Sequence, residues 1–312
     1  MHTICLPYHF DHEVDLMIQI VEHIARLGQP NTTFRFLLAC SPEREVSQPL
    51  ELAASKVAPT ASIHCPTLRP GYPDGASAMF WDCLDWTAEN ADDGFMLWLE
   101  SDMVPVDSNW LDRLDHHWRR VGDVTVMGCV VPTIEVPRGR RLNGRRKWTR
   151  IESHVNGGAC YHANAANRLR TVRRDGAFDI EIGHYLRDRG GYAHTPAIRL
   201  STTDHLANVV GCGGVSIVHG FLENKCDFVD AVARRCLNPN DPSATAAINP
   251  STTASMPTAN RHRSRSIARL HRDAMLRHYA SSPARLTAYL HDIGFGECDH
   301  RGDTTIAKRC AA

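Results

Sequence analysis

The stretch Gly94–Trp110, GFMLWLESDMVPVDSNW, changes abruptly from an apolar run to acid at Glu100 and Asp102. The run Phe95–Leu99 lacks polar alternation, which is typical of a central strand that helices cover on both faces. Ligands of open α/β sheets bind at the carboxyl ends of such strands. Two carboxylates separated by one residue can share a divalent cation. The stretch therefore predicts either a cation site at the end of a buried strand or, more simply, the solvated end of that strand.

The composition limits the classes of protein to be considered. The 312 residues are enough for one large domain or two modest ones. Lysine plus arginine and aspartate plus glutamate both number 35, so the formal net charge is zero. The net charge of the whole chain therefore does not indicate a nucleic acid or a membrane lipid as partner. No apolar stretch is long enough to span a bilayer, and the start MHTICLPYHF does not resemble a signal peptide, so a cytoplasmic protein without a transmembrane segment is expected. The eleven cysteines form no CxxC pair, which argues against a structural zinc site.

The first forty residues predict the fold class. Thr3–Pro7 reads as a short strand, Val14–Leu27 has apolar residues at helical spacing, and Phe34–Cys40 reads as a second strand. A strand, helix and strand in this order form a parallel unit with a right-handed crossover. The fold class is therefore expected to be α/β. Further helices are predicted at about Ala76–Thr87, at Trp110–Val121 and, after the glycine pair of HVNGGACYH, at Ala163–Val172.

A turn-rich loop precedes the helix predicted before the acidic strand. Gly75 and the first amides of that helix are candidates to approach an anionic ligand, with Arg69 adding positive charge. Asp74 is a third candidate at this site. The alternative is a simple turn in which Asp74 only caps the helix.

Three later segments carry further candidate site residues. The pair Gly157 and Gly158 indicates a backbone that another group approaches closely. Asp179 and Glu181 stand near the start of a predicted helix, either as favourable charges at its dipole or as a carboxylate base. His219 ends a predicted strand; it is either structural or a third ligand that joins two carboxylates around a metal such as manganese.

Basic segments stand apart from the predicted core. Residues 138–150, RGRRLNGRRKWTR, are expected to form a flexible loop, which could clamp phosphates, bind nucleic acid or be a solvated insertion. The composition indicates a core domain over residues 1–235, a flexible linker over 236–260 and a basic helical extension over 261–312. The basic tail is a second candidate contact for nucleic acid.

Taken in order, residues 1–225 resemble the glycosyltransferases of the GT-A fold, especially the inverting family two. The similarity rests on the proline-ended first strand, RPGYPDGASAMFWDCLDWT, the acidic strand, and HVNGGACYH followed by FDIEIGHYLRDRGG. Glu100-Ser101-Asp102 would stand for the DxD motif of that family, with glutamate in its first position. Asp179 aligns with the catalytic aspartate, although Phe178 replaces the acid that usually precedes it, and Glu181 aligns with a second acid.

The resemblance implies a three-layer sandwich with a mostly parallel central sheet. It also implies metal-dependent transfer of a sugar from a nucleotide diphosphate sugar to a saccharide or other hydroxyl acceptor, with inversion. Glu100, Asp102 and His219 would hold Mn²⁺ or Mg²⁺; Asp179 would be the base, with Glu181 as the alternative base. Arg69, Asp74, Gly75, Gly157 and Gly158 would contact the donor.

Two other classes of function stay open. A nucleotidyltransferase that makes a nucleotide sugar also builds a metal-diphosphate site, but no glycine-rich signature with a following lysine occurs near the first strand. A nucleic-acid-associated binding protein would use residues 138–150 and the basic tail. A glycosyltransferase that acts on a modified DNA base would be both a glycosyltransferase and a nucleic-acid-binding protein.

Overall fold

The computed structural model describes residues 1–8, 11–40, 45–65, 74–91, 93–131, 134–142, 145–151, 154–174, 176–187, 189–201, 203, 206, 209–211, 213–220 and 224–238. For residues 11, 12, 74, 131, 134–142 and 145–151 it describes the backbone alone. Within these ranges, no helix combines the length and the apolar character needed to cross a membrane. The chain divides into two compact units, and the first consists of Met1–Val131 and His154–Pro239. Of the linker predicted over residues 236–260, the structure describes only 236–238, at the end of a helix, and the extension predicted over 261–312 lies outside the described residues.

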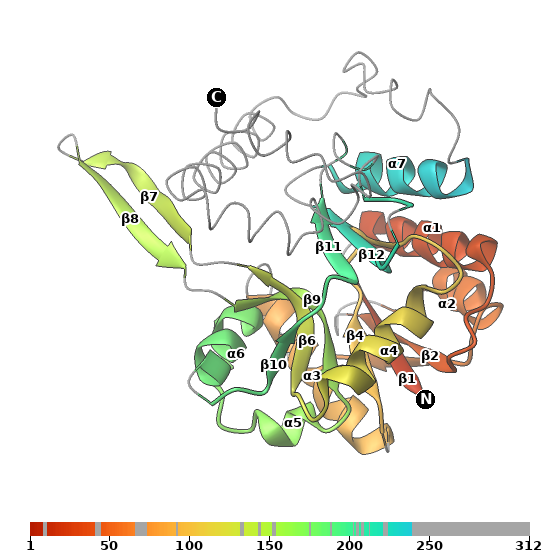
Figure 1. Cartoon of the computed structure of the whole chain (residues 1–312), viewed down its shortest axis with the longest axis horizontal. Coiled ribbons are helices and arrows are strands. Elements are labelled where there is room, and N and C mark those ends of the chain that lie inside the picture. The colour runs from red at the N-terminus through yellow and green to blue at the C-terminus, as the bar shows by residue number, and fades with distance from the viewer. Residues whose placement is uncertain are drawn as a thin grey trace, which may run out of the picture. The chain divides into compact units, whose positions relative to one another are not determined.

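A seven-stranded sheet forms the centre of the first unit, in the order β10-β6-β9-β4-β1-β2-β3 (Figure 1). Its strands are β1 (His2–Tyr8), β2 (Phe34–Cys40), β3 (Thr60–His64), β4 (Phe95–Trp98), β6 (Val126–Val131), β9 (His154–His162) and β10 (Tyr192–His194). All neighbouring strands are parallel except at β9, which runs antiparallel to both β4 and β6. The α/β class and the mostly parallel central sheet expected from the sequence are therefore confirmed.

Helices cover both faces of this sheet (Figure 1). They are α1 (Asp11–Leu27), α2 (Gln48–Ser55), α3 (Asp74–Asn90), α4 (Trp110–Val121), α5 (Ala165–Arg168), α6 (Phe178–Arg187) and α7 (Lys225–Leu237). Because side chains of a strand alternate between faces, Leu97 and Leu99 join one buried cluster with residues of α1, α2 and α4. Met96 and Trp98 join a second cluster with residues of α3, α5 and α6. The apolar side chains of β4 thus pack into both hydrophobic cores, one on each face of the sheet, as predicted for a central strand.

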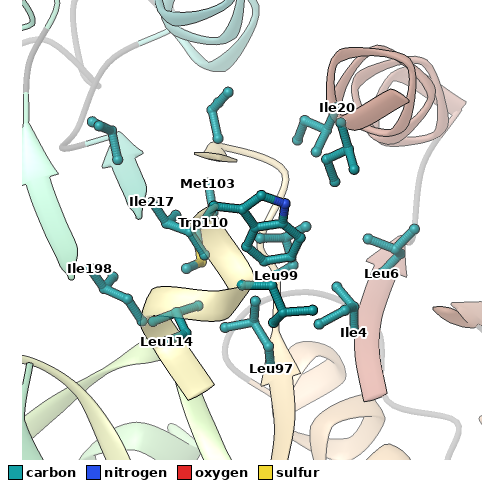
Figure 2. Close-up of a cluster of buried hydrophobic side chains, with 14 of the residues drawn as sticks. Ile4, Leu6, Ile20, Leu97, Leu99, Met103, Trp110, Leu114, Ile198 and Ile217 are labelled. Atoms are coloured by element: carbon teal, nitrogen blue, oxygen red, sulfur yellow. The ribbon is translucent and has the colours of Figure 1, made fainter. Parts of the chain in front are cut away.

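A second, three-stranded sheet with the order β11-β12-β5 completes the first core. Its strands are β5 (Met103–Pro105), β11 (Ile198–Ser201) and β12 (Ile217–Gly220). Trp110, the first residue of α4, is fully buried where the two sheets meet. Figure 2 shows its indole between Ile4 and Leu6 of β1 on one side and Ile198 and Ile217 of the small sheet on the other. This packing joins the end of the acidic strand to segments from late in the chain.

Two predicted segments differ from the structure. The expected helix after β9 is only the single turn α5, and the β-branched residues Thr171 and Val172 follow it. The prediction of a flexible loop over residues 138–150 is wrong for 138–142 and 145–150, because they belong to the antiparallel strands β7 (Ile134–Leu142) and β8 (Arg145–Ile151). The sequence carries a hairpin signal that the loop interpretation overlooked, since Asn143-Gly144 stands between segments with β-branched and aromatic residues.

Candidate metal centre

The topology of the large sheet places a ligand site beside β4. The chain proceeds outward from β1 to β2 and β3, and then returns to the other side of β1 as β4. Helix α1, which connects β1 to β2, packs in the first core, and α3, which connects β3 to β4, packs in the second, so these two connections cross opposite faces of the sheet. Ligands of open α/β sheets bind outside the carboxyl ends of strands at such a reversal of strand order. Glu100, Ser101 and Asp102 follow β4 at this position.

The acidic residues lie in a tight turn between two strands. The amide of Met103 donates to the carbonyl oxygen of Glu100 at 2.9 Å, which closes a turn over Ser101 and Asp102. Met103 then begins β5, a short strand that is buried throughout. The turn therefore presents two carboxylates from a backbone that is fixed on both sides.

Strand pairing brings His219 to this turn from far along the chain. β12 runs antiparallel to β5, and its register pairs His219 with Met103. The next amide, that of Gly220, donates to the carbonyl oxygen of Asp102 at 2.8 Å. The backbone position of His219 is thus set by the pairing of β12 with β5 and by the hydrogen bond from Gly220 to Asp102.

The three side chains form one cluster. His219 Nε2 lies 3.3 Å from Glu100 Oε2 and 3.3 Å from Asp102 Oδ1. One ligand atom from each of the three residues lies within 4.8 Å of the other two. Among the described residues this is the one group of at least three such side chains with that spacing. His219 is buried, while the carboxylates are partly accessible.

The electrostatics of the cluster favour positive charge between the carboxylates. Burial lowers the pKa of His219, but the neighbouring Asp102 and Glu100 outweigh this effect and raise it to about 10. Burial raises the pKa of Asp102, but the charges of His219 and Lys225 more than offset it and hold that pKa below its ordinary value. The imidazole is therefore protonated at neutral pH when no cation is bound.

The donor set fits a divalent transition metal. Asp102 Oδ1 is buried and faces the described part of the chain only through His219 Nε2 at 3.3 Å, so a cation that replaced the imidazole proton could take its lone pairs. Adjacent ligands of a six-coordinate ion with bonds of about 2.1 Å lie about 3 Å apart, and the observed 3.3 Å separations are close to this. Two carboxylates with one imidazole suit Mn²⁺ better than Mg²⁺, because Mg²⁺ prefers oxygen ligands alone.

The predicted glycine pair lies directly beside this cluster. A Cβ at Gly157 would come within 2.9 Å of Glu100 Oε1. A Cβ at Gly158 would collide with the sulfur of Met103 and would lie 3.1 Å from His219 Cε1. The close approach expected at these glycines is therefore made by Glu100 and His219 of the metal cluster together with Phe178 and Met103. Whether a donor also touches Gly157 and Gly158 stays a prediction.

The predicted base Asp179 belongs to the same constellation. Asp179 lies in the first turn of α6, and its Oδ2 is 3.7 Å from Nε2 of His154, the first residue of β9. Burial raises the pKa of Asp179, His154 opposes this rise, and the charge of Glu100 adds to it. Tyr161 lies near both acids, because burial and the charges of Asp179 and Glu100 all raise the pKa of its hydroxyl. A carboxylate with a raised pKa is suited to proton transfer.

The remaining predicted residues lie at different distances from this arrangement. The carboxylate of Glu181 lies against Gly176, in the segment before α6. Gly75 is buried in the first turn of α3, which begins at Asp74. That turn adjoins the start of α6, because the amide of Phe178 donates to Ser77 Oγ at 3.1 Å. Arg69 and the side chain of Asp74 lie outside what the structure describes.

Lys225 and Ser101 are not among the site residues predicted from the sequence. Lys225 is the first residue of α7, and its Nζ donates to Ser101 Oγ at 2.8 Å. Asn224 caps this helix by accepting from the amides of Cys226 and Asp227. The signal in the sequence was a basic residue just after a capping asparagine, shortly after His219. The ammonium group of Lys225 and the amino terminus of α7 therefore lie next to the acidic turn.

No protein-family model and no curated protein match the chain. Among solved structures, the galactosyltransferase LgtC in complex with donor and acceptor sugar analogues is 13% identical, with 84% of this chain and 99% of that chain covered and a TM-score of 0.45. An active-site mutant of LgtC is 15% identical, with the same coverage and a TM-score of 0.44. The enzyme 4-diphosphocytidyl-2C-methyl-D-erythritol synthase is 12% identical, with 62% and 86% covered and a TM-score of 0.39. Similarities this distant carry no argument about the reaction, and membership of family two stays a prediction.

Proposed function

We propose that this protein is a metal-dependent glycosyltransferase that moves a sugar from a nucleotide diphosphate sugar to an acceptor hydroxyl. The observation that carries the proposal is the cluster of Glu100, Asp102 and His219 at the reversal of strand order. The candidate base Asp179 lies near this cluster, since the charge of Glu100 raises its pKa. A donor diphosphate needs a cation site, and an acceptor hydroxyl needs a base. The geometry supplies candidates for both in one place.

The donor diphosphate would lie over the acidic turn. Glu100, Asp102 and His219 would hold Mn²⁺, or Mg²⁺ as the weaker alternative, and the bound cation would neutralise charge on the departing nucleotide diphosphate. Lys225 would contribute a second positive charge to the phosphates from the start of α7. Helix amino termini also favour anions, because their first amides lack helical partners. The Lys225–Ser101 hydrogen bond holds the ammonium at the turn.

Asp179 would accept the proton of the acceptor hydroxyl, and attack from that side would invert the anomeric carbon. Its raised pKa supports this role, since a base works best with a pKa near the working pH. His154 faces Oδ2 of Asp179, and the amide of Ile180 donates to its Oδ1 at 2.9 Å, so the carboxylate is held in place and a remaining lone pair would accept the proton. Glu181 is the alternative base, and its contact with Gly176 rather than His154 makes it the second choice. The acceptor is proposed to be a saccharide or another hydroxyl compound.

The test is a screen of nucleotide sugars for binding and turnover with and without Mn²⁺, repeated on Asp179→Asn and Glu181→Gln. We expect Mn²⁺-dependent donor binding in all three proteins and loss of transfer in Asp179→Asn alone. General bases contribute about 10²- to 10⁴-fold to rates, and a loss of this size is expected. Full transfer by Asp179→Asn would show that another residue is the base.

Repeating the screen with nucleoside triphosphates and sugar phosphates as substrates, on the wild type and on Asp102→Asn, separates the alternative reaction class. A nucleotidyltransferase would release pyrophosphate from a nucleoside triphosphate and a sugar phosphate, whereas a glycosyltransferase would release a nucleoside diphosphate from a nucleotide sugar. Pyrophosphate formation that needs Asp102, without any nucleoside diphosphate release from nucleotide sugars, would replace the proposed function.

A further inference from the structure

The hairpin β7–β8 concentrates positive charge that the metal centre does not use. Residues 134–151 contain six arginines and one lysine but only one glutamate. Because the whole chain has no net charge, the other residues together carry the compensating negative excess. Such a local excess creates a surface that attracts polyanions, although the net charge of the chain does not reveal it.

The register of the hairpin places like charges on the same face. Residues directly opposite each other in an antiparallel pair share a face, and like charges in such a pair are destabilising. Arg138 pairs directly with Lys147, whereas Glu135 pairs with Arg150. The hairpin thus pairs opposite charges near its base and like charges further out. An external anion would relieve the repulsion at the Arg138–Lys147 position.

The distal part of the hairpin is basic rather than apolar. Between Arg138 and Lys147, Leu142 is the one large apolar residue, whereas Arg140, Arg141, Arg145 and Arg146 are all charged. A segment that inserts into a lipid surface would carry aromatic and aliphatic residues at its end. Phosphate contacts, in contrast, require only cationic groups, and arginine suits them through its planar fork of donors.

The dimensions of the hairpin suit B-form DNA. Two paired strands are about 5 Å apart, and nine residues such as Ile134–Leu142 extend about 30 Å. The major groove of B-DNA is about 12 Å wide and admits a two-stranded ribbon. The major groove of A-form RNA is too narrow for side chains to read. We propose that the β7–β8 hairpin is a DNA-binding ribbon that docks on duplex DNA through its arginines and Lys147. This inference does not depend on the reaction proposed above.

The test measures binding of the full-length chain to a fluorescently labelled DNA duplex by anisotropy over a series of salt concentrations. The variant carries Arg138→Gln, Arg145→Gln and Lys147→Gln. The slope of log K against log salt is negative, and each lost phosphate contact reduces its magnitude by about 0.9. The three substitutions are therefore expected to reduce that magnitude by about 2.7. At low salt we expect the variant to bind at least tenfold more weakly than the wild type.

A matched triple variant tests whether charge alone explains the effect. Arg120→Gln, Arg170→Gln and Arg187→Gln remove the same charge from exposed positions on the first unit, and this protein should bind DNA as the wild type does. Equal weakening in both triple variants, or unchanged binding by the hairpin variant, would overturn the proposal. Binding to phosphatidylserine–phosphatidylcholine vesicles without binding to DNA would overturn it as well. Equal binding to duplex RNA would refute docking in the major groove.

Discussion

Replacement of Asp102 by asparagine tests the metal centre most directly, because it removes one negative charge while keeping the size of the side chain. The Asp102 side chain is only 15% exposed, and its Oδ1 lies 3.3 Å from His219 Nε2. At this burial an effective dielectric constant of about 20 is appropriate, at which two unit charges about 4 Å apart interact with about 4 kcal/mol. We expect Asp102→Asn to bind Mn²⁺ about a thousandfold more weakly than the wild type.

Mn²⁺ binding can be measured by the loss of the free-ion signal in electron paramagnetic resonance, alone and with a nucleoside diphosphate present. Asp107→Asn is the matched control, because Asp107 lies on the same segment but is 46% exposed and pairs with Arg113. An exposed ion pair contributes about 0–1 kcal/mol, so this control should bind Mn²⁺ normally. Circular dichroism and the thermal midpoint establish that both variants are folded. A folded Asp102→Asn protein with wild-type Mn²⁺ affinity would refute the metal centre.

Three further predictions follow from the packing and charges of the described residues. Gly158→Ala should destabilise the fold by about 1–3 kcal/mol in denaturant titrations, because its Cβ would overlap Met103; unchanged stability and Mn²⁺ affinity would contradict the close packing. Burial lowers the pKa of His23 in the folded protein. The neutral imidazole therefore contributes to the free energy of unfolding above about pH 6.5, and this contribution is lost as the pH falls through the lower pKa of the folded state. His23→Gln should reduce this loss of stability at acid pH, and an unchanged curve of stability against pH would show that His23 does not cause it. His154 opposes the rise in the pKa of Asp179, so His154→Gln should move the acidic limb of kcat/KM to higher pH, whereas an unshifted limb with a lower kcat would indicate a purely structural role.

The sequence by itself determined the class of fold and the position of the acidic turn. Strand β2 and helix α4 have the predicted bounds, because each is a regular pattern of apolar residues that ends at clear breakers. The apolar run before Glu100 indicates a strand buried on both faces, and the first polar residues after it lie at the carboxyl end of such a strand. These are local consequences of side-chain chemistry, and they need no knowledge of distant segments.

Only the tertiary structure decided which residues join that turn. The register between β5 and β12 sets His219 opposite Met103, and Lys225 reaches Ser101 because α7 starts just after the same strand. Pairing across more than a hundred residues leaves no local periodic signal, since each partner forms a short strand or a helix end on its own. The sequence could name His219 as a candidate, but the strand ladder decides that its imidazole lies between two carboxylates.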